Sequence, residues 1–386
     1  MDAMLPQIHS LSQNADQAGR RSIQRALRRI LLEIQDPKDI FYQLLNSHVE
    51  LTVVRLSMDL KLFEALINSE SPRTITSLAE QLKAGPDLLG RVLRYLAAQD
   101  LIQETGVEEF TGNATTKFLA DKGTDAVISH GFHVAGPVLQ VTPTYLAETN
   151  YQDLSDKNKT PFQKAFNTDL PAFAWLAEHP KHMENGQQAM VSTQSGEWVQ
   201  GFDLMDDAAT TFIKSRQPSS DRPFFVDVGG SYGHQTVHLR DRHPGLSGSL
   251  ILQDLPQVVE QAPKLDGIKA MAQDIFTPQA VEGARFYYIS RVLHDYPDNS
   301  CVQILRNLVP AMASDSRILV DETVLPDTNV TWQAAMGDLY MMLMAGGKER
   351  SERQWRSLAG SAGLRVTHLH VYDSSQHRAI LVLEKE

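Results

Sequence analysis

A histidine and an aspartate follow an apolar segment of the sequence. His294 and Asp295 come shortly after the run at 286–289 (FYYI), which is predicted to be a buried strand. A histidine with an ordinary pKa near ~6.5 can take a proton from a substrate at neutral pH. Glu322, at the end of the next predicted strand, is placed to hold the second ring nitrogen and stabilise the imidazolium. A lone histidine at a strand end is often structural, so a catalytic role for His294 depends on the residues around it.

A glycine-rich turn lies upstream, in the segment FFVDVGGSYGH at 224–234. An apolar strand, a turn and a helix in this order resemble nucleotide-binding turns, where glycine lets the backbone approach a ligand. Asp254 follows Gly229 by 25 residues, where an acid meets ribose hydroxyls in dinucleotide-type folds. Asp274 offers another acid further on. The sequence therefore predicts an adenosine site, although Asp254 alone could also be a turn residue before Pro256.

These residues fall within an alternating pattern of strands and helices. Near-continuous apolar strands that alternate with helices predict an α/β domain with a doubly wound parallel sheet at 216–386. The carboxyl ends of such strands are where open sheets bind ligands. The predicted strands are 224–228, 249–255, 284–293, 316–322 and 377–385, and the predicted helices are 233–243, 256–263, 298–313 and 350–363.

The N-terminal part, 1–125, shows a winged-helix pattern. Two short helices and a two-stranded wing follow a long helical region. The second helix carries only Arg91 and Arg94 against Asp87, and the net charge is −11, so we expect a structural module rather than a DNA reader. An amphipathic helix is expected to pack against the chain itself or a partner subunit. The expected elements are 17–35, 41–66, 76–83, 86–99, 102–104 and 109–111.

The composition is that of a cytoplasmic protein. Of 386 residues one is a cysteine, which excludes a disulfide framework. No window approaches ~18 uninterrupted apolar residues, and no signal-peptide pattern is present, so no membrane partner is expected. Residues 126–215 are expected to be a helical linker that helps to form the substrate pocket, and 216–223 a polar connection.

Six motifs in order resemble the small-molecule O-methyltransferases that depend on S-adenosylmethionine (SAM), including plant and fungal secondary-metabolite enzymes. This resemblance covers nearly the whole chain and implies a Rossmann-like methyltransferase domain with an N-terminal, mainly helical winged-helix dimerisation domain. It also implies a homodimer. The motifs are VDVGG-x-x-G, LQDLPQVVEQA, AQDIF, LHDYPDN, VDETVLPD and DLYMMLMAGGKERSERQW.

The resemblance also implies roles for the matching residues. His294 would be the general base, with Asp295 beside it and with Glu322 and Glu349 flanking the imidazole. Ser231 stands where the family usually has glycine, and Ser290 where it often has a basic residue. The residues expected to bind the cofactor are Asp227, Gly229, Gly230, Asp254, Leu255, Asp274, Ile275, Ser290 and Arg291.

The chemistry agrees with this family. A sulfonium donor needs no metal, because its methyl group passes in line to an oxygen nucleophile once the two are positioned and a proton is removed. A phenol with a pKa near ~10 needs such a base at neutral pH. We therefore predict methylation of a hydroxyl on an aromatic or polyketide-type metabolite.

The sequence also allows other hypotheses about the substrate pocket and the reaction. His130, His133, Phe166 and Met341 could line the substrate pocket, and a metal at the two histidines would need further ligands that the spacing does not reveal. A dehydratase or pericyclase of the same fold would use the sulfonium charge without methyl transfer. A transcription regulator or a cofactor-binding scaffold without turnover are the remaining alternatives.

Overall fold

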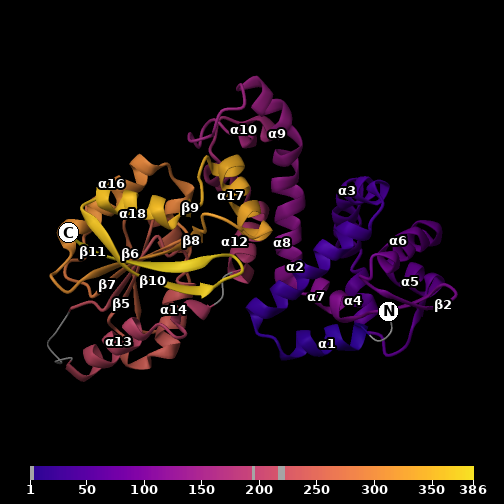
Figure 1. The fold of residues 1–386 in the computed structure, drawn as a ribbon, viewed down its shortest axis with the longest axis horizontal. Coiled ribbons are helices and arrows are strands. Elements are labelled where there is room, and N and C mark those ends of the chain that lie inside the picture. The colour runs from indigo at the N-terminus through magenta and orange to yellow at the C-terminus, as the bar shows by residue number, and fades with distance from the viewer. Residues whose placement is uncertain (1–3, 194–195, 216–221) are drawn as a thin grey trace. The chain divides into compact units, whose positions relative to one another are not determined.

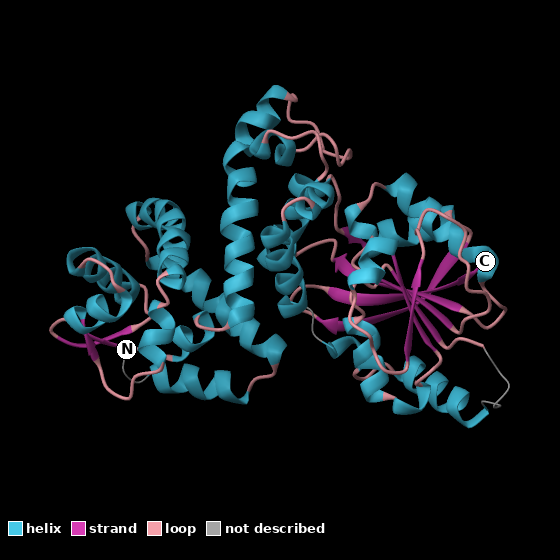
Figure 2. Ribbon diagram, turned by 180° about the vertical axis from the view of Figure 1, so that it is seen from behind, coloured by secondary structure: helices cyan, strands magenta, loops and turns pink. Residues whose placement is uncertain are grey.

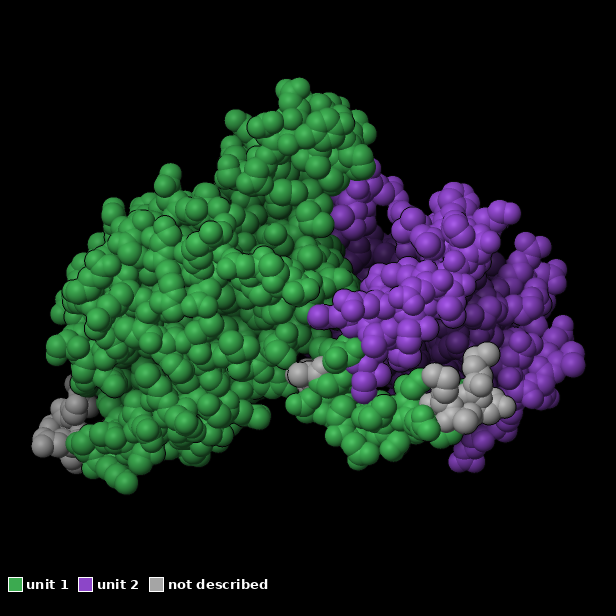
Figure 3. All heavy atoms as spheres, in the orientation of Figure 1, with its two compact units in different colours: residues 1–22, 142–172, 195–386 green, residues 23–141, 173–194 purple. Residues whose placement is uncertain are grey.

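The computed structural model describes residues 4–193, 196–215 and 222–386 (Figure 1). It divides into two compact units, coloured separately in Figure 3, of which one comprises residues 1–22, 142–172 and 195–386 and the other residues 23–141 and 173–194. Most of the polar connection expected at 216–223 lies outside the described residues. Within the described ranges, no helix has the length and apolar character needed to cross a membrane.

The second unit contains the predicted winged-helix elements, which are confirmed. Asp36 caps the long helix α3 through a capping box, and Pro37 occupies its first turn, where a missing N–H costs nothing. The continuous region expected at 41–66 is broken by Lys61, whose φ of 59° ends the helical path. The elements are α3 (Pro37–Asp59), α4 (Leu62–Ile67), β1 (Arg73–Thr74), α5 (Ile75–Leu82), α6 (Pro86–Ala98), β2 (Gln103–Gly106) and β3 (Glu109–Thr111).

The core of this module follows from helical periodicity. Leu89, Val92, Leu93 and Leu96 recur at helical spacing along α6 and are all buried. They pack in one apolar cluster with Phe110 of the wing. The further helices of the chain are α1 (Met4–Asn14), α2 (Gln17–Ile34), α7 (Ala114–Leu119), α8 (Lys122–His130), η1 (Gly131–Ala135), α9 (Gly136–Glu148), α10 (Pro161–Phe166), α11 (Ala172–Ala177) and α12 (Pro180–Thr193).

The first unit is built on a mixed sheet with the strand order β10-β11-β8-β7-β4-β5-β6. Its strands β4 to β8 run parallel, as predicted, while β11 is antiparallel to β8 and β10 is antiparallel to β11. The short β9 pairs with the end of β8. The strands are β4 (Phe225–Val228), β5 (Leu250–Asp254), β6 (Ile268–Ala272), β7 (Phe286–Ser290), β8 (Arg317–Leu325), β9 (Arg350–Ser351), β10 (Leu364–Asp373) and β11 (Arg378–Lys385).

Both faces of this sheet are covered, because side chains alternate along each strand. One set, including Val226 and Tyr287, packs with α16 and α18, while the other, including Phe225 and Tyr288, packs with α13 and α14 (Figures 1 and 2). The carboxyl ends of β4, β5, β7 and β8 therefore meet at one edge. The helices of this unit are η2 (Gly196–Val199), α13 (Asp203–Ser215), α14 (His234–Arg242), η3 (Pro244–Leu246), α15 (Pro256–Gln261), η4 (Leu293–Asp295), α16 (Asp298–Leu308), η5 (Val309–Ala311), α17 (Trp332–Ala345) and α18 (Glu352–Ser361).

Candidate active site

The glycine turn after β4 is shaped by a buried acid beneath it. Asp227 accepts a hydrogen bond from the Thr236 hydroxyl at 2.6 Å, and burial raises the pKa of its carboxyl to about 7. A side chain at Gly230 would overlap this carboxylate, and Gly229 has a φ of 74°. Gly230 is therefore required for close packing on Asp227, and Gly229 for a left-handed backbone.

Asp254, at the end of β5, lies beside this turn. Its carboxylate accepts hydrogen bonds from the backbone N–H groups of Ser231 (2.8 Å) and Leu255 (2.7 Å). The N–H groups of Gly229 and Gly230 meanwhile donate to the carbonyl of the preceding residue, Gln253. The predicted pairing of the glycine turn with the acid on the next strand is thus present in the structure.

A third strand end adds to this edge of the sheet. Asp274 is exposed after β6, and its carboxylate accepts the N–H of Phe276 at 2.9 Å. Ile275 packs against the apolar cluster of the sheet. Tyr296, for which the sequence predicted no role, lies near the acids of both the strand ends and the His294 turn. Burial, together with Asp295, Asp274 and Asp254, raises the pKa of its phenol to about 12.

These strand ends carry the residues that are expected to hold the adenosine portion of SAM. The missing Cβ of Gly230 leaves room for the Asp227 carboxylate and that of Gly229 for Val292, while Asp254 presents a carboxylate at a strand end, where an acid is expected to bind ribose hydroxyls in this type of sheet. The exposed Asp274 and the partly buried Ile275 follow one strand further along.

The turn between β7 and η4 begins with two of the predicted cofactor residues. The Ser290 hydroxyl donates to the Asp321 carboxylate at 3.4 Å. Arg291 has a φ of 53°, and its N–H donates to the Asp321 carbonyl at 3.0 Å. Its guanidinium is desolvated, which lowers its pKa, and its charged neighbours include Glu349 and Glu322. Arg291 therefore lies among the acids that surround His294.

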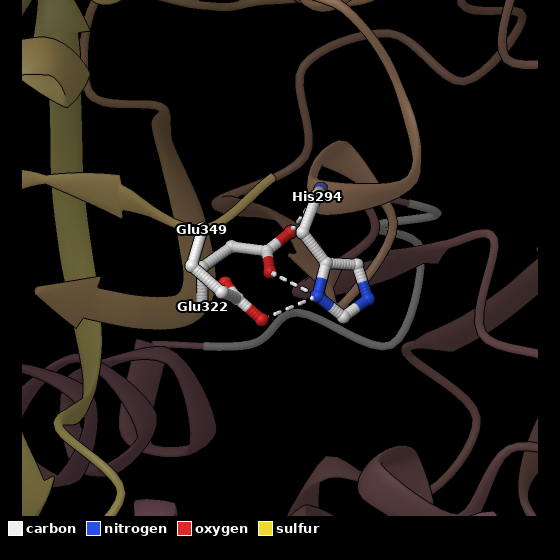
Figure 4. Close-up of side chains that lie close together, drawn as sticks. All are labelled: His294, Glu322 and Glu349. Atoms are coloured by element: carbon white, nitrogen blue, oxygen red, sulfur yellow. Dashed lines mark hydrogen bonds and ion pairs between the residues drawn. The ribbon is translucent and has the colours of Figure 1, made fainter. Parts of the chain in front are cut away.

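His294 is buried, and its ring contacts a carboxylate from a distant part of the chain. Nδ1 lies 2.9 Å from Oε1 of Glu349, as Figure 4 shows. A carboxylate is only an acceptor, so Nδ1 carries a proton, and in the neutral imidazole Nε2 is the nitrogen with the free lone pair. Asp295 lies 3.7 Å from Nε2, beyond hydrogen-bond distance. This arrangement makes Nε2 the atom that can receive a proton.

Glu322 contributes mainly through the backbone. Its Oε1 accepts from the N–H groups of Val292, Leu293 and His294 at 3.1, 2.9 and 3.3 Å. Its Oε2 lies 3.7 Å from Nδ1 of His294 (Figure 4). Glu322 thus fixes the turn that carries the histidine, whereas Glu349 holds the ring.

The electrostatics of this cluster make His294 a strong base. Burial alone would lower the pKa of the imidazole, but Glu322, Glu349 and Asp295 outweigh it and raise the pKa to about 9. Burial also raises the pKa of Glu322 to about 7, against the opposing effect of the His294 charge. The imidazole therefore holds its proton more firmly than a free histidine does.

Gly347 is a position where the structure admits no side chain. A Cβ there would overlap the carbonyl oxygen of His294, which already accepts the N–H of Lys348 at 2.9 Å. We expect Gly347→Ala to displace the turn, lowering kcat at least ~10-fold and unfolding stability by about 1–3 kcal/mol. Thermal melts and initial rates measure this. Gly337→Ala on α17 is the matched control, because a Cβ there meets no atom within 4 Å; equal effects of the two substitutions would contradict the expectation.

The predicted pocket residues lie in different units. Met341 is half-buried on α17, which packs against η4. Phe166 on α10 lies with its ring centre 4.8 Å from that of Phe162, the two rings tilted by 39°, and α10 also packs against α17. His130 and His133 belong to the other compact unit. There the His133 and His182 rings are 6.4 Å apart, and burial together with His182 lowers the pKa of His130.

Comparison with known proteins identifies the family. Residues 154–365 match the O-methyltransferase domain, and residues 42–118 match the O-methyltransferase dimerisation domain. The chain is 37% identical over 385 residues to demethylsterigmatocystin 6-O-methyltransferase of Aspergillus flavus, covering 100% of this chain and 98% of that protein. It is also 37% identical over 368 residues to the O-methyltransferase lepI of the same species, covering 95% and 94%.

Solved structures agree with the sequence comparison. The complex of LepI with SAM has a TM-score of 0.90 at 35% identity and covers 100% of this chain and 98% of that one. A structure described as a pericyclic reaction enzyme also has a TM-score of 0.90 at 35% identity, with 100% and 99% covered. The chain belongs to the O-methyltransferase family and is a SAM-dependent O-methyltransferase of the kind found in fungal secondary metabolism.

Proposed function

We propose that this enzyme methylates a hydroxyl of an aromatic or polyketide-type secondary metabolite, with Nε2 of His294 as the general base. The observation that carries the proposal is the 2.9 Å contact between Nδ1 of His294 and Glu349. It orients the free lone pair of Nε2 and stabilises the imidazolium that forms when the substrate proton arrives. Asp295 helps to shape this side of the ring.

SAM supplies the methyl group when it is bound, and this chemistry requires no metal. The protein has to hold the substrate oxygen in line and remove its proton as the oxygen becomes a nucleophile. A base whose pKa is near 9 is well matched to a phenol with a pKa near ~10. Phe166 and Met341, which belong to the unit that contains His294, are proposed to contact the substrate.

The cofactor is proposed to lie along the ends of β4, β5, β6 and β7. Asp254 is the most informative residue there, because its carboxylate both accepts the Ser231 N–H and lies where ribose hydroxyls are bound. The proposed cofactor-binding residues are Asp227, Gly229, Gly230, Asp254, Leu255, Asp274, Ile275, Ser290 and Arg291.

Asp254→Asn is expected to weaken cofactor binding. Loss of a charged hydrogen-bond acceptor costs about 1.5–3 kcal/mol, so the dissociation constant for SAM should rise roughly 10- to 100-fold. Isothermal titration calorimetry measures it, with Asp266→Asn, an exposed acid on the turn before β6, as the control. Equal affinity in both variants would remove Asp254 from the site.

We also propose that the chain forms a homodimer through its N-terminal region, which contains the matched dimerisation domain. Large apolar side chains at the start of α3 are exposed in the single chain: Phe41, Tyr42, Leu44 and Leu45 are 54–70% exposed. Sedimentation equilibrium should give twice the chain mass of 43.1 kDa. A single-chain mass at micromolar concentration would contradict the dimer.

A second candidate is a dehydration or pericyclic reaction without methyl transfer. It is favoured by the similarity to the pericyclic reaction enzyme and by the presence of His130, His133 and Arg291. The complete His294, Glu322 and Glu349 cluster favours methyl transfer, since a rearrangement needs no base with this support.

The proposed function is tested with paired substrates. Aromatic hydroxyl compounds and their own methyl ethers are incubated with enzyme and SAM, and S-adenosylhomocysteine (SAH) release is measured alongside product mass. Methyl transfer predicts SAH and a product heavier by one CH₂ only from the hydroxyl member of a pair. Release of SAH from neither member across aromatic and polyketide-type hydroxyls would contradict the proposal.

A further inference from the structure

Arg350 is a fully buried arginine next to the acid that holds the catalytic ring. Its relative exposure is 0%, and its Nη1 donates to the carbonyl of Leu293 at 3.1 Å, while Nη2 donates to that of Tyr296 at 2.7 Å. Nε donates to the carboxylate of Asp298 at 2.9 Å. Two of these three partners are backbone carbonyls on either side of His294.

The turn that carries His294 is therefore held from both sides. Glu322 binds its N–H groups, and Arg350 binds its carbonyls. The Glu322 carboxylate accepts hydrogen bonds from N–H groups of the turn, and the Arg350 guanidinium donates to its carbonyls. A turn this short has too few residues to form these hydrogen bonds internally.

Arg350 also connects this turn to the ring partner. It follows Glu349 directly, and its strand β9 is in parallel register with β8, where Arg350 pairs with Val324. The guanidinium lies 5.1 Å from the ring centre of Trp355, which covers it on the core side. One rigid segment thus places the Glu349 carboxylate and also the backbone of His294.

We propose that Arg350 is a positioning residue for methyl transfer, setting His294 at the distance from Glu349 at which Nε2 faces the substrate oxygen. The proposal rests on the proposed function of His294 as the base. Arginine is required because its planar fork reaches two carbonyls at once, which the single ammonium of lysine does not do in a fixed geometry.

The test is Arg350→Lys, which keeps the charge and removes the fork. We expect kcat to fall roughly 100-fold, as for a displacement of about 1 Å at a reacting group, with KM and SAM affinity almost unchanged. The acid limb of the kcat/KM profile should move to lower pH, because a ring further from its carboxylates loses the interaction that raises its pKa. Arg356→Lys is the control, since Arg356 is exposed on α18 and paired with Glu352.

A second variant guards against misfolding. Asp298 has an exposed side chain, so Asp298→Asn weakens the ion pair that holds Arg350 without creating a cavity in the core. It should give a smaller loss of kcat and a shift of the acid limb in the same direction. An unchanged kcat and pH profile in both variants would overturn the proposal, as would a fall in SAM affinity that matches the fall in kcat.

The failure of the base assignment is distinguishable from the failure of this proposal. Arg350→Lys is repeated in a His294→Ala background. A positioning role predicts that the second substitution adds little, because there is no base left to position. Full multiplicative losses would show that Arg350 acts independently of His294, whereas wild-type activity of His294→Ala by itself would refute the base.

Discussion

Replacing His294 by alanine is expected to lower kcat for methyl transfer by roughly 10²–10⁴-fold, the contribution of a positioned general base. The Nε2 atom is the group on the turn that can receive the substrate proton, since Nδ1 is bound to Glu349 at 2.9 Å. SAM affinity should change little, because most of the proposed cofactor residues, Asp254 among them, lie at the ends of β4, β5 and β6 and not in the turn that carries His294. Initial rates at saturating SAM and calorimetric titration measure the two quantities.

The control for this variant is His368→Ala, an exposed histidine on β10 in the same compact unit. Thermal melts of both variants separate lost chemistry from lost folding, because His294→Ala leaves two carboxylates facing each other in a buried site. A folded His294→Ala enzyme with the wild-type kcat would show that another group removes the proton.

Glu349→Gln should have the second-largest effect and a characteristic pH signature. The active form of the base is neutral, so kcat/KM rises with pH up to the pKa of His294, near 9 in the free enzyme. The Glu349 carboxylate is one of the groups that raise this pKa, so its loss moves the acid limb to lower pH. The plateau should nevertheless fall roughly 10²-fold or more, because the tautomer is no longer enforced.

Glu352→Gln is the matched control, since this acid stands three residues away, has a side chain that is 45% exposed, and pairs with Arg356. Its profile should coincide with that of the wild type. An acid limb that stays in place after Glu349→Gln, or that moves to higher pH, would contradict the role given to the carboxylate.

Much of this site could be predicted from strand ends. His294 follows β7, Glu322 lies on the adjacent β8 just past the residue that pairs with the end of β7, and Asp254 ends β5, so the sheet brings them to one edge. Glu349 was different, because it lies 55 residues from His294 after a helix, and only the resemblance pointed to it. The contact depends on how α17 and β9 return to the sheet, which no local pattern encodes.

Residues that act through the backbone were missed. Arg350 binds two carbonyls beside His294 in addition to Asp298, and Gly347 makes room for the carbonyl of His294, so these roles depend on backbone groups that a sequence pattern does not reveal. Tyr296 was noted only as part of the LHDYPDN motif, and no role was predicted for it. In the other unit, His182 lies beside His133 although about fifty positions separate them.

The fold was predicted where hydrophobicity is continuous and missed where it is not. The buried strands β4, β5, β7 and β8 are strongly apolar, whereas β6 and β10 expose many of their side chains. Exposed edge strands carry a weaker signal because only part of their surface is buried. Strand direction is also absent from such a pattern, which explains why the antiparallel β11 was predicted as a strand within a parallel sheet.

The most direct test of the account follows the methyl group itself. The enzyme is incubated with a hydroxyl substrate and SAM carrying a deuterated methyl group, and product and cofactor are measured by mass spectrometry. We predict a product that carries the whole labelled methyl group, with one SAH formed per product, and formation of both in His294→Ala at a rate lower by the factor given above. A product with the substrate's own mass, formed while the labelled SAM stays intact, would contradict methyl transfer and favour a rearrangement.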